Sequence, residues 1–252
     1  MTRPRFLVAQ DLAETSELLL SSELAHRAAR VLRLRPGDQV VLFDGSGLEA
    51  EAVVTAISAR EVGLRILQRS TPPREAPVRV VLYQALIAAT RFELVLEKGT
   101  ELGVQAFVPT VCARCTSRPA PAHALAGKLA RWRAVTVAAA EQSGRTRLPE
   151  VSKPLPLEEA LASSPGPKLF AWEHAVEPLP KVLEHLQELH PQAVSLFVGP
   201  EGGFTAEEAA LARSCGAVAV SLGPRTLRAE TAAIVLCALS LLALGGLAPP
   251  AG

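Results

Sequence analysis

Cysteine is scarce in this sequence, which has four cysteines among 252 residues. So few cysteines in a chain of this length exclude a disulfide framework, and we expect all four to be reduced. Cys112 and Cys115 are the only close pair, a CxxC that could be a redox pair or half of a zinc site. Because no second CxxC and no pair of histidines accompanies it, we predict no bound metal.

The sequence also lacks a strong excess of charge, since 26 basic and 25 acidic residues leave a net charge of +1. This balance argues against a protein that coats nucleic acid by charge alone. The basic residues are nevertheless gathered: residues 110–150 hold seven Lys or Arg and two Glu, whereas residues 151–192 hold three Lys and six Glu. A local basic surface suits phosphate contacts, although it could also be only a solvated face.

Long apolar segments are few. No apolar run follows residues 1–5, so we expect no secretory signal peptide and a cytoplasmic protein. The apolar run 232–248, interrupted only by Ser240, is short for a membrane span of about 20 residues. We therefore predict no membrane association, and a helix buried in protein, part of it against a second subunit.

The arrangement of apolar runs predicts an α/β protein of two domains, with a proline-rich linker at 71–77 between them. Residues 1–72 are typical of a small β-rich domain, with strands expected at 6–9, 39–43, 48–57 and 61–67 and a helix at 23–34. In the second domain, residues 76–252, helices at 91–102, 122–142 and 181–189 alternate with strands at 78–85, 106–110, 168–172, 193–198 and 217–222.

The helix expected at 23–34 has an apolar face and a basic face. On a helical wheel the apolar residues, which include Val31 and Leu32, fall on one arc. The opposite arc carries three arginines, Arg27, Arg30 and Arg33. Such a face either contacts an anionic partner or merely keeps the helix soluble.

Two loops rich in Gly and Pro, at 198–204 and 222–231, each follow one of these apolar strands. Parallel strands end at the same edge of a sheet, where loops and helix N-termini converge on ligands. Glycine lets the backbone approach a ligand closely. Neither loop has the GxxxxGK[ST] pattern of a phosphate-binding loop, and no GxGxxG opens a βαβ unit. We therefore predict a small-molecule site of another kind.

Five segments of the sequence resemble the motifs of one family. These segments are VGPEGGFTAEE at 198–208, LGPRTLRAETAAI at 222–234, FELVLEKGTELGV at 92–104, AEQSGR at 140–145 and VLRLRPGD at 31–38. Together they resemble the RsmE family, the 16S rRNA uridine-N3 methyltransferases of the SPOUT superfamily. The resemblance spans nearly the whole chain, and several long motifs in one order are much more specific than a single glycine-rich loop.

This resemblance implies a fold and partners that the pattern of residues alone does not give. The C-terminal domain would be a SPOUT-type α/β domain with a deep trefoil knot, preceded by a small PUA-like β-barrel. The protein would be a homodimer that acts on 16S rRNA or on the assembled small ribosomal subunit. S-adenosyl-L-methionine would be the methyl donor, and the acceptor would be N3 of a uracil.

The resemblance also implies where the donor binds. Backbone groups of the two loops would contact its adenine, and Leu222 and Leu227 could sandwich the ring. The expected donor-binding residues are Val198, Gly199, Pro200, Glu201, Gly202, Gly203, Ser221, Leu222, Gly223, Arg225 and Leu227.

Three residues are expected to take part in catalysis: Arg228, Glu230 and Glu141. The guanidinium of Arg228 could stabilise the anion that forms when uracil loses its N3 proton. Glu230 is a candidate proton acceptor or an orienting partner of Arg228, although it could also only stabilise the first turn of its own helix. Glu141 is expected near the substrate pocket.

The scarcity of aromatic residues, 4% of the chain, leaves little surface for base stacking, so RNA recognition should depend on arginines and RNA shape. The expected RNA contacts are Arg27, Arg30, Arg33, Gln142 and Arg145. Arg145 could instead complement the end of the helix before it. A scaffold protein that has lost transfer activity is the alternative function, and the intact loops favour the enzyme.

Overall fold

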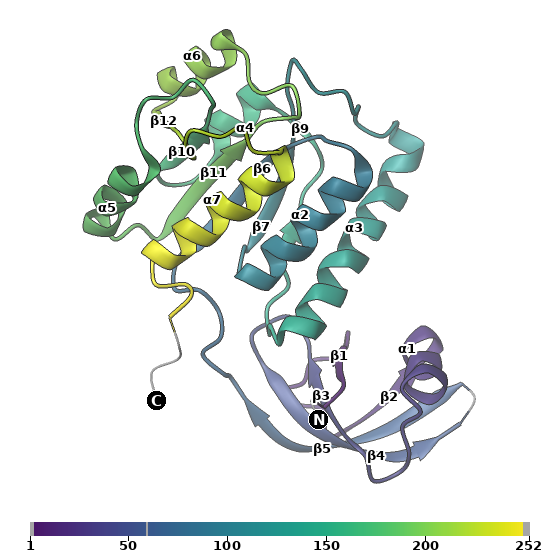
Figure 1. Cartoon of the computed structure of the whole chain (residues 1–252). Coiled ribbons are helices and arrows are strands. Elements are labelled where there is room, and N and C mark those ends of the chain that lie inside the picture. The colour runs from purple at the N-terminus through teal and green to yellow at the C-terminus, as the bar shows by residue number, and fades with distance from the viewer. Residues whose placement is uncertain (1–2, 59, 249–252) are drawn as a thin grey trace. The chain divides into compact units, whose positions relative to one another are not determined.

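The computed structural model describes residues 3–58 and 60–248, which divide into two compact units (Figure 1). The first unit runs up to Glu75 and includes a later segment, Ala140–Leu148. The second unit holds Ala76–Ala139 and the chain from Pro149 onward. The first unit ends within the expected linker, but the sequence pattern did not predict that residues 140–148 belong to it.

The first unit is built on a five-stranded sheet with the order β1-β3-β4-β5-β2. Its strands are β1 (Arg5–Leu7), β2 (Glu17–Ser21), β3 (Gln39–Phe43), β4 (Glu49–Ile57) and β5 (Glu61–Ser70). Only β1 and β3 pair in parallel. Strand β2 was not expected, because its run of three leucines hides the alternation in which Leu18 and Leu20 are buried and Leu19 is exposed.

The helix expected at 23–34 is wrong in its length and in its faces. Helix α1 (Ser22–His26) continues only as a π-helical turn, η1 (Arg27–Val31). A π turn holds more residues than an α turn, so the wheel drawn at α-helical spacing loses register after α1. Ala28 is buried as expected, but Val31 is 67% exposed.

The second unit contains a seven-stranded sheet in which every pairing is parallel. Its main order is β12-β10-β11-β6-β7-β8, and β9 also pairs with β7. The strands are β6 (Arg79–Ala85), β7 (Ala106–Val111), β8 (Glu150–Val151), β9 (Leu155–Pro156), β10 (Lys168–Ala171), β11 (Ala193–Val198) and β12 (Ala217–Val220). Strands buried on both faces explain the near-continuous apolar runs of the sequence.

Helices cover both faces of this sheet (Figure 1). They are α2 (Ala89–Leu102), α3 (Ala122–Ser143), α4 (Leu157–Ser163), α5 (Leu179–Leu189), α6 (Ala206–Ser214) and α7 (Ala229–Ala243). Along β6, Val80 and Leu82 pack in the core with α2, α5 and α7, while Val81 and Tyr83 pack in the core with α4 and α6. The predicted α/β fold with a parallel sheet is confirmed.

Helix α7 corresponds to the apolar run near the C-terminus, and it is largely buried within its own unit. Leu236 is completely buried there, whereas Leu239 and Leu242 are 39% and 61% exposed. Within residues 3–58 and 60–248, no helix combines the length and apolar character needed to cross a membrane.

Candidate functional site

A cavity of about 420 Å³ lies where three neighbouring strands, β12, β10 and β11, reach their carboxyl ends. The loops that follow these strands form most of its wall, as expected for the ligand edge of a parallel sheet. Its volume is that of a small-molecule site. The lining residues are Arg91, residues 171–173, 198–204 and 221–229, and Ala232.

All the residues that the sequence predicted for donor binding line this one cavity, and so does Arg228. They come from two segments some twenty residues apart, which β11 and β12 bring to the same edge. The sequence could predict this grouping because each segment directly follows a recognisable buried strand.

The first loop, residues 199–205, is held by contacts along its length. The side chain of Gln84 donates to the carbonyl of Gly199 at 3.4 Å, and Glu201 Oε1 accepts from the backbone N–H of Ala88 at 3.1 Å. At the end of the loop, Thr205 and Glu208 form a capping box that starts α6. The loop therefore presents its backbone to the cavity in a fixed shape.

Gly203 is the position in this loop where the backbone conformation favours glycine. Its φ is +69°, and a Cβ atom there would lie 2.6 Å from Oε1 of Glu173. The neighbouring Gly202 is less constrained, since a Cβ there would meet Arg114 Cβ at 3.1 Å. The close packing of Glu173 on Gly203 joins the loop after β10 to the loop after β11.

An arginine on the cavity wall forms ion pairs that the sequence did not indicate. Arg91, from the first turn of α2, lies 3.5 Å from Glu201 Oε1 and 3.8 Å from Glu230 Oε1. Glu230, on the first turn of α7, is only 8% exposed and does not line the cavity. Among the described residues, its Oε2 has no hydrogen-bond partner.

Arg91, Trp172 and Glu173 are the polar or aromatic cavity residues that the sequence analysis missed, together with two alanines, Ala171 and Ala232. A usable signal existed for two of them, because Trp172 and Glu173 directly follow β10 and so lie at the same edge as the two loops. Arg91 gave no such signal, since it lies on a helix and its position beside Glu201 and Glu230 arises only from the packing of α2 on α7.

Glu141, which was expected near the substrate pocket, is not among the residues that line the cavity. It belongs to the first unit, where its carboxylate accepts two hydrogen bonds from Arg27, at 2.8 and 2.9 Å, and one from the backbone of Leu7 at 3.1 Å. The guanidinium of Arg27 also lies 4.8 Å from the centroid of the Phe6 ring. These bonds hold the last turn of α3, which belongs to the first unit, against β1 and η1 of that unit.

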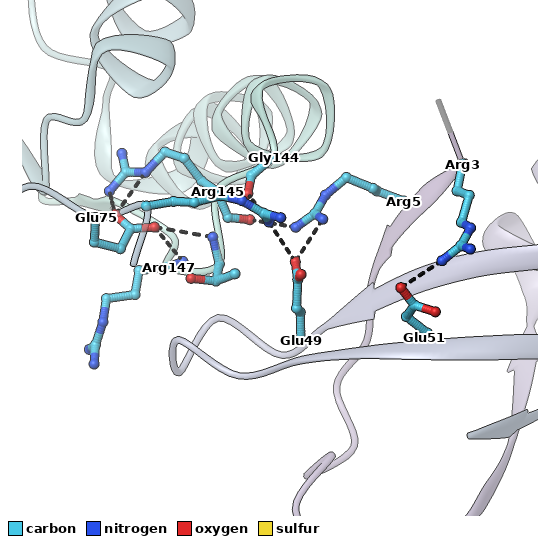
Figure 2. Close-up of polar contacts among 10 residues, drawn as sticks. Arg3, Arg5, Glu49, Glu51, Glu75, Gly144, Arg145 and Arg147 are labelled. Atoms are coloured by element: carbon cyan, nitrogen blue, oxygen red, sulfur yellow. Dashed lines mark hydrogen bonds and ion pairs between the residues drawn. The ribbon is translucent and has the colours of Figure 1, made fainter. Parts of the chain in front are cut away.

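Arg145 is also committed to a contact within the first unit (Figure 2). It is 5% exposed, and its guanidinium donates twice to Glu75 Oε2, at 3.1 and 2.7 Å. The other oxygen of Glu75 accepts from the backbone N–H groups of Thr146 and Arg147. The structure therefore corrects the expectation for Arg145, because this buried, paired side chain offers no surface to a phosphate.

Glu49 lies close by in the same unit, and Arg5 donates to its Oε2 at 2.8 Å (Figure 2). Arg74 donates to the same oxygen at 2.7 Å. Burial alone would raise the pKa of the Glu49 carboxyl, but hydrogen bonds from Arg5 and Arg74 outweigh burial and lower it. Burial likewise opposes the effect of Arg145 at Glu75, whose pKa is also lowered. Both carboxylates therefore stay ionised to a lower pH than an ordinary glutamate.

The remaining predicted site residues are exposed. Arg30 and Arg33 lie at and after the end of η1, and Gln142 lies on the last turn of α3. Arg228 is the N-cap residue of α7 at the cavity. All four cysteines are free thiols, and the described residues contain no group of three or more His, Cys, Asp or Glu that could hold a metal ion.

Comparison with known families gives two matches. Residues 74–241 match the family described as RNA methyltransferase domain, and residues 21–67 match the RNA methyltransferase PUA domain. The predicted order, a PUA domain followed by an α/β methyltransferase domain of the SPOUT type, is thereby confirmed. The trefoil knot stays a prediction.

The curated relatives described here share one name. The chain is 41% identical over 216 residues to ribosomal RNA small subunit methyltransferase E of Mycobacterium tuberculosis, which covers 82% of this chain and 79% of the relative. Identity to the Bacillus subtilis protein of the same name is 29% over 240 residues, 90% of each chain.

Solved structures are similar over almost the whole chain. The structure of ribosomal RNA small subunit methyltransferase E from Neisseria gonorrhoeae bound to S-adenosyl methionine superimposes with a TM-score of 0.85 at 33% identity, covering 94% of this chain and 96% of the other. A methyltransferase from Legionella pneumophila in complex with the same cofactor gives a TM-score of 0.88 at 30% identity, with coverage of 96% and 98%.

Proposed function

The chain belongs to the ribosomal RNA small subunit methyltransferase E family, and from that premise we propose that it methylates N3 of a uracil in 16S rRNA. The enzyme class, an rRNA methyltransferase that depends on S-adenosylmethionine, follows from the family. The observation that carries the proposal for this chain is the cavity itself, which gathers both loops of the family's motifs at one sheet edge.

The residues of the cavity fit the methyl donor. Backbone N–H and C=O groups of the two loops can hydrogen-bond an adenine edge, and Leu222 and Leu227 offer apolar surface for the ring. Glu173 and Glu201 both line the cavity, and their negative charge favours a cationic sulfonium. The donor supplies an electrophilic methyl group, and the loops hold it in a fixed place for the acceptor.

Arg228 is the residue that we assign to the acceptor. It is exposed at the cavity and caps the N-terminus of α7, where the helix dipole adds to its positive charge. A cation in this place stabilises the negative charge that develops on uracil when the N3 proton leaves.

Glu230 acts through Arg91 in this proposal. Because Glu230 is buried behind the cavity wall, its carboxylate together with that of Glu201 positions the guanidinium of Arg91, which does line the cavity. Glu230 is then a positioning residue.

RNA contacts are proposed for the PUA domain. Arg30 and Arg33 are exposed at the end of η1, within the segment that matches the family's PUA domain. Arg27 contributes less, since Glu141 already engages its guanidinium. Gln142 is exposed and remains a candidate. The substrate is 16S rRNA or the assembled small subunit, and the protein acts in the cytoplasm as a homodimer.

Titration calorimetry with S-adenosylhomocysteine, followed by transfer of a labelled methyl group to small-subunit rRNA, tests the function. We expect micromolar binding and labelling of one uridine. Binding without labelling of either naked rRNA or assembled subunits would favour the scaffold alternative, and absence of binding would refute the donor site.

A further inference from the structure

Cys112 and Cys115 lie on a tight turn just after β7. The backbone N–H of Cys115 donates to the carbonyl of Cys112 at 3.1 Å, which is the hydrogen bond of a β-turn. Such a turn keeps the two Cα atoms within about 7 Å. A disulfide needs a similar separation, so the pair can be bridged without rebuilding the backbone.

The two thiols differ in their surroundings. Sγ of Cys115 accepts a hydrogen bond from the backbone N–H of Cys112 at 3.3 Å, and its residue is partly exposed. The side-chain hydrogen bond from Cys112 and backbone N–H groups of Cys112 and Leu86 lower the pKa of the Cys115 thiol to about 7. Cys112 is buried, and its hydrogen bond with Cys115 and its burial raise its pKa. This is the asymmetry of an attacking thiol and a resolving thiol.

The residues between the two cysteines contact the first donor loop. Arg114 Nη1 donates to the carbonyl of Gly202 at 3.0 Å, and Gly202 lines the cavity. The backbone N–H of Ala113 donates to Glu208 Oε1 at 2.7 Å, and Glu208 belongs to the capping box that ends the same loop. These two hydrogen bonds connect the turn to both ends of the segment 202–208.

We propose that Cys112 and Cys115 are a redox site that closes to a disulfide by exchange with a small disulfide of the glutathione type, and that closure weakens donor binding in the adjacent cavity. The effect on the donor rests on the proposed function, whereas the exchange itself does not. The described residues provide no third ligand beside the two thiols, so the arrangement suits a dithiol better than a metal.

The exchange proceeds in two steps. The Cys115 thiolate attacks one sulfur of glutathione disulfide, a mixed disulfide forms, and one glutathione thiolate leaves and takes up a proton. Cys112 then loses its proton and attacks the Cys115 sulfur, which releases the second glutathione. Two cysteine thiols are oxidised to one disulfide, and glutathione disulfide is reduced to two glutathione molecules.

The test incubates the full-length protein in glutathione buffers of increasing oxidised fraction, quenches it with acid and an alkylating agent, and maps the cysteines by peptide mass. We expect a Cys112–Cys115 disulfide, with Cys215 and Cys237 still alkylated or inaccessible. Cys112→Ser should stop at a mixed disulfide on Cys115, and Cys115→Ser should take up no glutathione at the turn. Wild-type peptides lacking the disulfide at the most oxidising ratio would overturn the proposal.

Calorimetry with S-adenosylhomocysteine on the reduced and oxidised proteins tests the coupling. We expect oxidation to weaken binding at least about fivefold, reversibly on addition of dithiothreitol, and Arg114→Ala to reduce this difference. Equal affinities of the reduced and fully disulfide-bonded proteins would refute the coupling. If reduced protein fails to bind the ligand, the proposed function fails instead, while the peptide map still decides the redox site.

Discussion

Gly203 shows at the scale of one residue how the backbone shapes the candidate donor site. Its φ is positive, and a side chain there would have to displace the Glu173 carboxylate. The glycine-rich sequence of the loop predicted that its backbone approaches a ligand closely. It could not reveal that a neighbouring carboxylate also occupies the space over Gly203, because Glu173 is thirty residues away in the sequence.

We expect Gly203→Ala to weaken S-adenosylhomocysteine binding by at least about tenfold, because the new Cβ displaces Glu173 and strains the loop. Gly216→Ala is the matched control: Gly216 also has a positive φ, of 78°, but a Cβ there meets nothing within 4 Å. Calorimetry should show near-normal affinity for the control variant. Equal losses in the two variants would mean that backbone strain, and not the geometry of the cavity, causes the effect.

Arg228 provides the second prediction at this scale. Arg228→Ala should lower the rate of methyl transfer by roughly 10²-fold or more while donor affinity changes little, because the charge acts on the acceptor in the transition state. Arg228→Lys should recover only part of the rate, since a lysine lacks the planar fork of donors. Single-turnover transfer assays together with calorimetry measure both quantities. Wild-type turnover of either variant would remove Arg228 from the mechanism.

At the scale of elements, the segment 140–148 differs most clearly from what the sequence indicated. Its resemblance to a family motif suggested a role beside the substrate, yet the structure uses Glu141 and Arg145 in ion pairs of the first unit. A sequence motif indicates that its residues are important, but it does not show which other residues they contact. The partners Arg27 and Glu75 lie 114 and 70 positions away, and no local pattern connects them.

Local patterns did predict the elements whose signals lie within a few residues. The buried strands β6, β10 and β11 and the loops after them were expected close to where they occur. Strand β2 was missed because its three consecutive leucines hide the alternation of buried and exposed side chains, and helix α4 was missed because it has only seven residues. The helix at 23–34 was misjudged because a π turn shifts its register. The candidate cavity could be predicted because most of its wall is formed by loops that directly follow buried strands, whereas the place of Arg91 depends on helix packing.

Removing the buried pair tests the structural role of this segment. Arg145→Ala leaves the half-buried Glu75 carboxylate with only its two backbone donors, and we expect it to lower the free energy of unfolding by about 1.5–3 kcal/mol. The exposed pair Arg3–Glu51, visible in Figure 2, provides the control. Glu51→Gln should cost less than about 1 kcal/mol. Denaturant unfolding gives both values, and a small loss in Arg145→Ala would contradict the structural role.

The same cluster should make stability depend on pH. The pKa values of Glu49 and Glu75 are lowered by folding, so the stability they contribute is present above the ordinary value of 4.5 and is lost as pH falls through their folded values. We expect the unfolding midpoint to fall with acidification below this value. Glu75→Gln should reduce that dependence, and an unchanged pH profile in this variant would show that Glu75 does not titrate as described.

At the scale of the whole molecule, the exposure of the residues on α7 determines which substitutions can test the predicted homodimer. Leu236 is buried within its own chain, so a charge there would unfold the domain and say nothing about assembly. Leu242, which is 61% exposed, is the informative position. Leu242→Glu should yield a folded monomer. Val31→Glu, at a position 67% exposed in the first unit, should leave the dimer intact.

Light scattering at micromolar concentration, with circular dichroism as a check of folding, distinguishes these outcomes. A wild-type protein that is already monomeric would refute the predicted dimer. A Leu242→Glu variant that stays dimeric would instead place the interface elsewhere on the molecule.

Mass mapping of 16S rRNA tests the central claim most directly. Cells lacking this protein are compared with the same cells complemented by the wild type or by Arg228→Ala. The account predicts that one uridine of 16S rRNA loses a single methyl group in the deletion, that the wild type restores it, and that Arg228→Ala restores little of it. Identical methylation of every uridine in the presence and absence of the protein would contradict the account.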